Sequence, residues 1–235
     1  MTTSPDSETQ RILGEYERRA REVPPDFYAL YRPANLFNYQ GQQRALLKAL
    51  HAAAMIPLAE RRILETGCGQ GQWLAIYEAF GAQRANLAAV DLDPARAAFA
   101  AARFPGADIR QGNATELPWS DKSFDIVSQS TMFTSVLDPA TRLAIAGEML
   151  RVLKTGGAIL WYDFLFDNPR NPNVRGIGRS EIRRLFPGCE TRLWRVTLAP
   201  PLARRLVPVS WSLARLLEKF RILNTHYFGI VRKPA

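Results

Sequence analysis

A run of eleven residues, Ile63 to Trp73, constrains the fold of this chain more than any other stretch. It begins as a short apolar strand, passes through glycines at 67, 69 and 71, and continues as an amphipathic helix. The glycines let the backbone approach a ligand closely, and the helix N-terminus offers free N–H groups. A strand that ends in a glycine turn and opens a helix therefore predicts a nucleotide-type ligand.

The spacing of these glycines argues against a dinucleotide. A dinucleotide fingerprint is G-x-G-x-x-G, whereas here the third glycine comes one residue early and position 72 is Gln. Glu65 also stands two residues before the first glycine, where it would repel a pyrophosphate. A ligand with a free amino group and no phosphate fits this stretch better.

Strands and helices alternate from Arg61 onward. Strands separated by helices of about 10–15 residues predict a parallel sheet with right-handed crossovers. We predict strands at 62–66, 87–91, 108–111, 124–129 and 158–163, and helices at 71–81, 94–103 and 139–153. Two further strands, at 190–198 and 225–232, bring the predicted sheet to seven strands.

The two ends of the chain depart from this alternation. Residues 1–10 are polar and are expected to be disordered, and helical patterns follow at 11–22 and 44–54. The segment at 26–43, between those patterns, is rich in aromatic and amide residues and includes Tyr39. Residues 200–223 interleave apolar positions with five basic ones and predict a basic amphipathic arm before the last strand. Its basic residues are Arg204, Arg205, Arg215, Lys219 and Arg221.

Length and composition favour one domain in a reducing compartment. A chain of 235 residues with 47% hydrophobic content can fill the core of one α/β domain and has little room for a second. No apolar run approaches the ~18–20 residues that span a bilayer, and residues 1–10 lack a signal-peptide core. Cys68 and Cys189 form neither a metal-binding spacing nor a disulfide framework. We therefore expect a cytoplasmic protein without a metal site.

The net charge of +9 belongs to the last third of the chain. From Asn168 onward there are 14 Lys or Arg against 3 Asp or Glu, a balance of +11, which leaves −2 for residues 1–167. An acidic small substrate, a membrane surface or nucleic acid could explain this asymmetry. A solvated arginine-rich surface is the simplest alternative.

The pattern E-x-G-x-G-x-G at 65–71 resembles motif I of the class I S-adenosylmethionine-dependent methyltransferases, in their methyltransferase type 11 or UbiE-like group. Four further motifs follow in the order of that family. They are Val90-Asp-Leu-Asp-Pro94, Asn113-Ala114, the link from Glu116 to Asp125, and the approach to the fifth strand from Met149 to Gly157. The resemblance spans about residues 61–163, which is the cofactor half, and says little about the methyl acceptor.

The resemblance implies a Rossmann-like, mostly parallel seven-stranded sheet with helices on both faces and an antiparallel last strand. Residues 1–60 would form an N-terminal helical lid, and residues 61–235 the methyltransferase domain, with the arm at 200–223 inserted before the last strand. The implied cofactor is S-adenosyl-L-methionine, which leaves as S-adenosyl-L-homocysteine.

The resemblance also implies roles for particular residues. Glu65 and the backbone at 67–71 suit the methionine end, and Asp91 suits the two ribose hydroxyls. Asn113 replaces an acid that receives the adenine amino group, and its amide oxygen can still accept that bond. The predicted cofactor contacts are Tyr39, Glu65, Gly67, Cys68, Gly69, Gly71, Asp91, Leu92, Asn113, Ala114 and Gln129.

The acceptor side offers fewer signals. Transfer to a hydroxyl needs a base, and the candidates are Asp163 and His226, although Asp163 could instead cap a loop and His226 could be structural. Arg170, Asn173 and Arg175 lie in the loop expected to border the acceptor pocket, where arginines suit phosphate or carboxylate.

The predicted activity is therefore methyl transfer to a hydroxyl of a small molecule or glycan, with an anionic or lipid-linked acceptor among the candidates. Peripheral contact with the inner face of the membrane stays open, because the arm could lie in a membrane interface. The chain lacks the Asn/Asp-Pro-Pro-Tyr/Phe motif of many N-methyltransferases, which disfavours nucleic acid. The alternatives are an RNA methyltransferase that uses the basic third and a non-catalytic cofactor-binding protein. The sequence specifies no oligomeric state.

Overall fold

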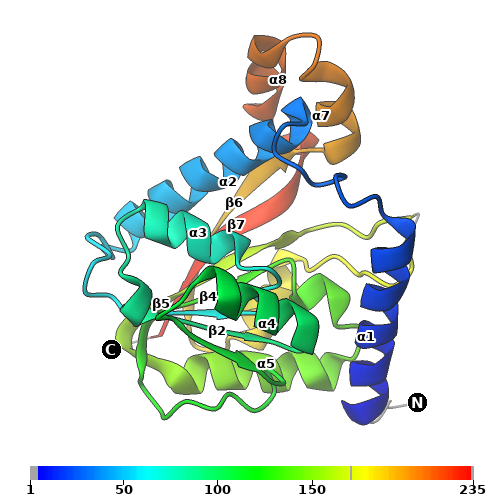
Figure 1. The fold of residues 1–235 in the computed structure, drawn as a ribbon. Helices are drawn as coiled ribbons and strands as arrows, with labels where there is room; N and C mark the ends of the chain where they lie inside the picture. The colour runs from blue at the N-terminus through cyan, green and yellow to red at the C-terminus, as the bar shows by residue number, and fades with distance from the viewer. Residues whose placement is uncertain (1–4, 170, 234–235) are drawn as a thin grey trace.

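A seven-stranded sheet runs through the computed structural model, which describes residues 5–169 and 171–233 (Figure 1). The strand order is β3-β2-β1-β4-β5-β7-β6; the first five strands are parallel, and β7 is antiparallel to both of its neighbours. This confirms the predicted Rossmann-like sheet. The strands are β1 (Ile63–Thr66), β2 (Leu87–Asp91), β3 (Asp108–Gln111), β4 (Phe124–Ser130), β5 (Leu153–Phe164), β6 (Glu190–Leu198) and β7 (Asn224–Arg232).

Helices cover both faces of the sheet. One core cluster joins the sheet to α2, α3 and α4, and a second joins its other face to α5 and α6. Among the described residues the α-helices are α1 (Pro5–Glu22), α2 (Pro33–Ala52), α3 (Gln72–Ala79), α4 (Pro94–Arg103), α5 (Pro139–Val152), α6 (Arg179–Leu185), α7 (Pro200–Leu206) and α8 (Trp211–Glu218). None of these helices is long and apolar enough to cross a membrane.

The central strands are buried along their whole length. Every residue of β1 and β2 is buried, as expected for parallel strands covered on both sides. Ile63 belongs to one core cluster and Leu64 to the other, so successive side chains serve opposite faces. The carboxyl ends of β1, β2 and β4 meet at one edge of the sheet, because all three strands run in the same direction.

Strand β5 is longer than its predicted range, 158–163. It begins at Leu153, and the predicted turn at Thr155-Gly-Gly lies inside it. The pairing with β4 passes from Phe124↔Leu153 to Ile126↔Ala158, so the extra residues of β5 bulge out between the two pairs. Gly156 supplies the positive φ, 75°, that such an irregularity needs.

The expectation of disorder over residues 1–10 is wrong for residues 5–10, which belong to α1; residues 1–4 lie outside the described part. Glu8 is buried, and its carboxylate accepts the backbone N–H groups of Leu137 and Asp138. These contacts come from residues distant in the sequence, so local polarity could not indicate them. Similarly, α2 begins at Pro33 rather than at 44, with a proline in its first turn.

The predicted arm contains two short helices. Helix α7 ends at Leu206, and Ser210 caps α8 by accepting the N–H of Leu213. We call residues 200–223 the upper lobe, which stands at the top of Figure 1. It has its own small core, in which Phe37 of α2 meets Trp211 edge to face, with ring centroids 5.3 Å apart.

Substitution of two adjacent leucines of α2 tests whether this helix packs in the core. Leu46 is fully buried in the cluster on the sheet, and Leu47 is largely exposed. Leu46→Ala is expected to lower the free energy of unfolding by about 2–5 kcal/mol, because it leaves a cavity. Leu47→Ala should change it by about 0.5 kcal/mol or less. Urea unfolding measures both, and equal effects would show that α2 does not pack as described.

Candidate active site at the carboxyl edge of the sheet

The turn after β1 is bound to β2 by its backbone. The N–H groups of Gly67 and Cys68 both donate to the carbonyl oxygen of Val90, at 2.8 and 3.1 Å. Gly67 has a φ of 69°, and a Cβ at that position would lie 2.8 Å from the side chain of Met132. A glycine is therefore required here by both conformation and space.

Asp91, at the end of β2, also binds the backbone of the turn that follows β1. Its carboxylate accepts the N–H of Gly69 at 2.7 Å and the N–H of Asp93 at 3.0 Å. The residue is only 4% exposed, and burial raises the pKa of its carboxyl. Each oxygen accepts one backbone bond, so lone pairs remain for a ligand's hydroxyl groups.

A recess, partly open to solvent, lies beside Asp91. It is lined by residues at or after the carboxyl ends of β1, β2, β3 and β4, by two residues of α5, and by one face of α1, which forms its roof. The lining residues are Glu8, Thr9, Ile12, Tyr16, Gly67, Val90, Asp91, Leu92, Asn113, Ala114, Met132, Ser135, Val136, Thr141 and Ile145. The structure thus brings five predicted cofactor contacts into one pocket: Gly67, Asp91, Leu92, Asn113 and Ala114.

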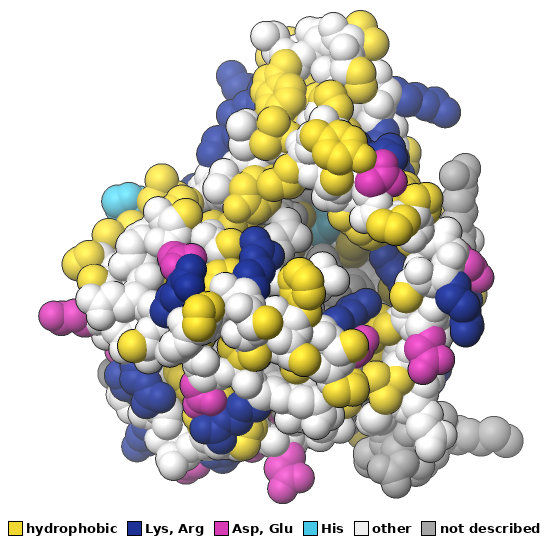
Figure 2. Space-filling view, viewed as in Figure 1, with side chains coloured by type: hydrophobic (Ala, Val, Ile, Leu, Met, Phe, Trp, Pro, Cys, Tyr) yellow, Lys and Arg dark blue, Asp and Glu magenta, His cyan; other side chains and the backbone are white. Residues whose placement is uncertain are grey.

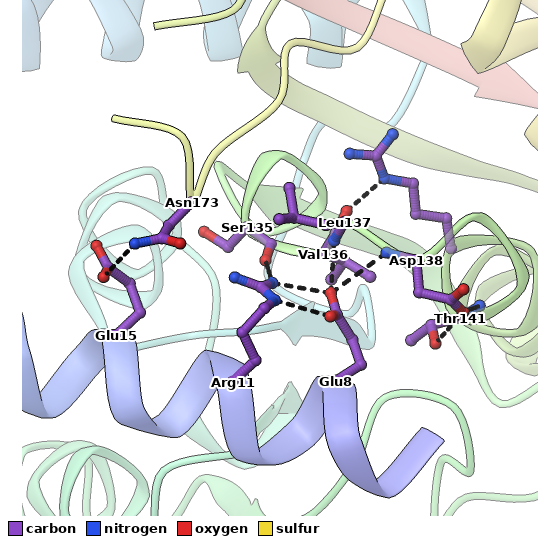
Figure 3. A network of polar contacts seen from close by, with 10 residues as sticks. Glu8, Arg11, Glu15, Ser135, Val136, Leu137, Asp138, Thr141 and Asn173 are labelled. Atoms are coloured by element: carbon purple, nitrogen blue, oxygen red, sulfur yellow. Dashed lines mark hydrogen bonds and ion pairs between the residues drawn. The ribbon is translucent and has the colours of Figure 1, made fainter. Parts of the chain in front are cut away.

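A polar network holds α1 over this recess (Figure 3). Glu8 accepts the N–H of Leu137 at 2.5 Å and pairs with Arg11 at 2.8 Å. Arg11 also donates to the carbonyl oxygen of Ser135 at 2.5 Å. Although burial raises the pKa of Glu8, the bonds from Arg11 and Leu137 outweigh it and hold that pKa below its usual value.

The residues of α1 were missing from the predicted site. Glu8, Ile12 and Tyr16 follow one another at intervals of four, so they share one face of the helix, and that face lines the recess. The interval was visible in the sequence, but nothing there indicated what the face would cover. Tyr16 is fixed by the guanidinium of Arg96, 3.7 Å from its ring centroid.

Glu65 lies within β1 and outside the lining of the recess. It is fully buried, and the hydroxyl of Ser128 donates to its carboxylate. Burial raises the pKa of Glu65 to about 8, because no cation among the described residues pairs with it. The buried hydroxyl of Tyr77 lies nearby.

The other predicted cofactor contacts also lie outside the recess lining. Gly69 and Gly71 belong to the turn, with φ values of 54° and 77°. Cys68 is buried, and burial raises the pKa of its thiol, which keeps it protonated. Gln129 accepts the N–H of Met132 at 3.2 Å, and Tyr39 packs partly buried against the core cluster of α2 and α3.

Two threonines near Tyr162 have a strained backbone. Thr131 follows β4 with a φ of 53°, and Thr197 in β6 has a φ of 66°. Positive φ is a genuine outlier for a β-branched residue, and such strain is concentrated at functional sites. Thr131 donates its N–H to the Tyr162 carbonyl, and the Thr197 hydroxyl lies 2.9 Å from the Tyr162 hydroxyl. Both strained residues therefore converge on the carboxyl half of β5.

Asp163, a predicted base, is held by three donors. Its fully buried carboxylate accepts the hydroxyl of Thr134 at 2.8 Å, the Thr134 N–H at 3.2 Å and the Phe164 N–H at 2.8 Å. Burial raises its pKa to about 7, against the lowering effect of the Thr134 hydroxyl. The carboxylate fixes the short helix η2 (Phe133–Ser135), which borders the recess, against the end of β5.

His226, the other predicted base, is buried between aromatic rings. It stacks on Tyr162 with centroids 4.8 Å apart and an interplanar angle of 6°, and its centroid lies 3.8 Å from that of Phe164. Burial lowers its pKa to about 3, so the imidazole is neutral at physiological pH. Nδ1 lies 3.1 Å from the Thr225 hydroxyl, while Nε2 makes no hydrogen bond to the described residues.

The described residues of the loop predicted to bind the acceptor contact neighbouring helices. Asn173 donates to Glu15 of α1 at 2.8 Å, so it supports the roof of the recess. Arg175 lies 3.6 Å from the carboxylate of Glu181 in α6. Arg170 lies outside the described residues.

The residues present fit S-adenosylmethionine. Glu65 is a buried carboxyl with only a hydroxyl partner, and an ammonium group is the kind of neighbour that would restore its charge. Asp91 keeps lone pairs for a ribose diol, and Asn113 can accept a second bond beside that from the Thr115 N–H. Asp91 and Asn113 line one recess. None of the described residues that line it is Lys or Arg, so the recess offers no cation for a phosphate.

Comparison with known proteins agrees with this fit. A family model described as a methyltransferase domain matches residues 64–161. A probable S-adenosylmethionine-dependent methyltransferase of Mycolicibacterium smegmatis is 38% identical over 136 residues, which are 54% of this chain and 51% of that protein. A demethylmenaquinone methyltransferase of Clavibacter sepedonicus is 35% identical over 52% of this chain and 48% of its own length. The chain thus spans about half the length of these two relatives.

Two further similarities extend over more of the chain. An uncharacterized protein of Haemophilus influenzae is 33% identical over 180 residues, which are 74% of this chain and 70% of that protein. The crystal structure of an S-adenosylmethionine-dependent methyltransferase from Archaeoglobus fulgidus shares the fold, with a TM-score of 0.57 and 18% identity. The match covers 84% of this chain and 98% of that one. By the sequence of residues 64–161, the chain belongs to the class I S-adenosylmethionine-dependent methyltransferases of the UbiE-like group, and its fold agrees with that assignment.

Proposed function

We propose that the protein transfers a methyl group from S-adenosylmethionine to a hydroxyl group of a small acceptor. The observation that carries this proposal is His226, a neutral buried imidazole whose Nε2 has no partner among the described residues. Its strand pairs it with Phe164, at the carboxyl end of β5. Because the glycine turn follows the carboxyl end of β1, the imidazole and the cofactor recess lie at the same edge of the sheet.

The cofactor supplies an activated methyl group with a neutral leaving group, so the protein's contribution is mainly positioning. Helix α1 covers part of the recess. Asp163 fixes η2 in place and is already committed to three donors, so we assign it a positioning role. His226 is left to accept the proton of the hydroxyl through Nε2.

The surroundings of His226 indicate the class of acceptor. Burial makes the imidazole a weaker base than free histidine, so of the hydroxyl acceptors the more acidic ones, such as phenols and hydroquinones, demand least of it. Tyr162 and Phe164 flank it with flat apolar surfaces. The relative named a demethylmenaquinone methyltransferase supports an acceptor of this kind over RNA. Glycan and anionic hydroxyl acceptors belong in the same screen.

Label transfer tests this proposal. The full chain is incubated with S-adenosylmethionine labelled in its methyl group and with phenols, hydroquinones, sugars, amines and RNA. We expect label in a methyl ether of a phenolic hydroxyl, released by hydriodic acid. His226→Phe should lower turnover by about 10²- to 10⁴-fold while cofactor binding is kept.

The control is His51→Phe, which alters the exposed histidine of α2 and should leave turnover unchanged. Label on carbon, which hydriodic acid does not release, or label on amine or RNA, would contradict transfer to a hydroxyl. Cofactor binding without transfer to any acceptor would indicate a non-catalytic protein.

We also propose that α1, rather than the whole of residues 1–60, is the lid of the site. Helix α2 packs into the core of the sheet along much of its length, whereas α1 covers the recess through the polar contacts of Figure 3 and the apolar side chains of Ile12 and Tyr16. Cofactor exchange would then require these contacts to open, while α2 stays in place.

Glu8→Gln tests the lid. The substitution removes the charge that pairs with Arg11 and accepts the N–H groups of Leu137 and Asp138. Since a hydrogen bond to a charged group contributes about 1.5–3 kcal/mol, we expect S-adenosylhomocysteine to dissociate at least about tenfold faster in a stopped-flow measurement. Glu17→Gln, in the same helix but exposed, is the control. An unchanged dissociation rate in Glu8→Gln would mean that α1 does not retain the cofactor.

A further inference from the structure

The upper lobe exposes an unusual amount of apolar surface. Val209 is 83% exposed, Leu213 42%, Leu216 51%, Phe220 56% and Ile222 79%. Figure 2 shows apolar side chains gathered on the lobe, above a hollow that separates it from the body of the molecule. A cluster of exposed large apolar residues in so short a segment indicates an interaction surface.

These side chains are not needed for the fold of the lobe. Leu213, Leu216 and Phe220 follow one another at intervals of three and four, so they share one side of α8 and its extension. The inner side carries Ala214, which is buried in the lobe's core with residues of α2 and α7, and Leu217, at the border between the two sides, is partly buried in the same core. The outer side of α8 therefore faces solvent although the helix is already anchored by its inner side.

Unpaired positive charges accompany the apolar residues. Arg205, Lys219 and Arg221 are exposed and form no ion pair among the described residues. The lobe's other two cations are engaged, since Arg215 pairs with Glu218 and Arg204 lies over the ring of Phe27. Glu218 is the lobe's single acidic residue, so the exposed outer side is cationic and apolar at once.

We propose that the upper lobe docks on a membrane surface containing anionic phospholipid. Leu213, Leu216, Phe220 and Ile222 would enter the boundary between headgroups and acyl chains, and Lys219 and Arg221 would meet the phosphate groups. An amphipathic helix with aliphatic and aromatic residues between basic ones binds membranes in this way. The anionic headgroups complement the three unpaired cations of the lobe.

Other occupants fit this surface less well. In a symmetric dimer the same patch would face itself, which would bring the unpaired cations of two copies together. A nucleic acid would meet the cations but would leave the aliphatic side chains of α8 without an apolar partner. A dimer and a complex with RNA would each give a different result from vesicle binding in the experiment that tests the proposal.

Membrane docking goes beyond the proposed methyl transfer and does not depend on it. Docking requires only the outer side of the lobe, whereas transfer requires the recess under α1 and the imidazole at the end of β5. A soluble acceptor would therefore leave the docking proposal intact, and failure to dock would leave the cofactor site intact.

Vesicle co-sedimentation tests the proposal with the full chain. We expect binding to phosphatidylcholine vesicles that contain phosphatidylglycerol to be about tenfold or more stronger than to phosphatidylcholine alone, and to weaken as salt is raised. The double variant Leu216→Ser/Phe220→Ser and the double variant Lys219→Gln/Arg221→Gln should each lose at least about tenfold in vesicle binding.

The matched control is Leu143→Ser, which replaces a leucine of α5 that is 53% exposed on the body of the molecule. It should leave vesicle binding unchanged. Binding of S-adenosylhomocysteine, measured for every variant, shows that each remains folded. Vesicle binding that is absent in the wild type, or equal in all variants, would overturn the proposal. Dimerisation through this patch in sedimentation experiments would also overturn the proposal, as would binding of RNA in preference to anionic vesicles.

Discussion

The structure depends on the bond between the Asp91 carboxylate and the N–H of Gly69. This bond, with those from Gly67 and Cys68 to the Val90 carbonyl, joins the turn after β1 to the end of β2. The turn needs glycine where Met132 approaches, and its shape decides where α3 begins. The recess exists because this turn, the ends of the neighbouring strands and α1 enclose one space. An acid buried at this point therefore holds the backbone and lines the recess at once.

Three ionisable groups near the carboxyl edge of the sheet are buried, and none has a charged partner among the described residues that fully offsets the cost of burial. Burial raises the pKa of Glu65 to about 8 and that of Asp163 to about 7, and lowers that of His226 to about 3. Near neutral pH, Glu65, Asp163 and His226 together therefore carry less charge than the same side chains would carry in water. These groups lower the free energy of unfolding near neutral pH, because the two acids ionise at lower pH in the unfolded chain. Groups with strongly shifted pKa values are concentrated at functional sites. We propose that Glu65 meets a cationic ligand and that His226 meets a group that gives up a proton.

Much of the fold could be predicted from the sequence, because the central elements are local in origin. Strands β2 and β3 and helix α4 match their predicted ranges; an apolar run marks β2 and Pro94 marks the start of α4 directly. The predicted contacts Gly67, Asp91 and Asn113 come together because parallel strands end at one edge. What could not be predicted depends on contacts distant in the sequence. Helix α1 is fixed by the backbone of residues 135–138, β5 is extended by its pairing with β4, and the roles of Ser128 and Thr134 appear only beside Glu65 and Asp163.

The most direct measurement of the central claim, that the recess beside Asp91 holds S-adenosylmethionine, is calorimetric titration with S-adenosylhomocysteine and with NAD. The wild-type protein is expected to bind one S-adenosylhomocysteine and no NAD. Asp91→Asn should weaken this binding by about 10²-fold, because a carboxylate oxygen that accepts hydroxyl bonds is lost. Asp93→Asn should bind normally, because Asp93 caps α4 and asparagine caps equally well. Binding of NAD, or equal affinities in the two variants, would contradict the assignment of the recess.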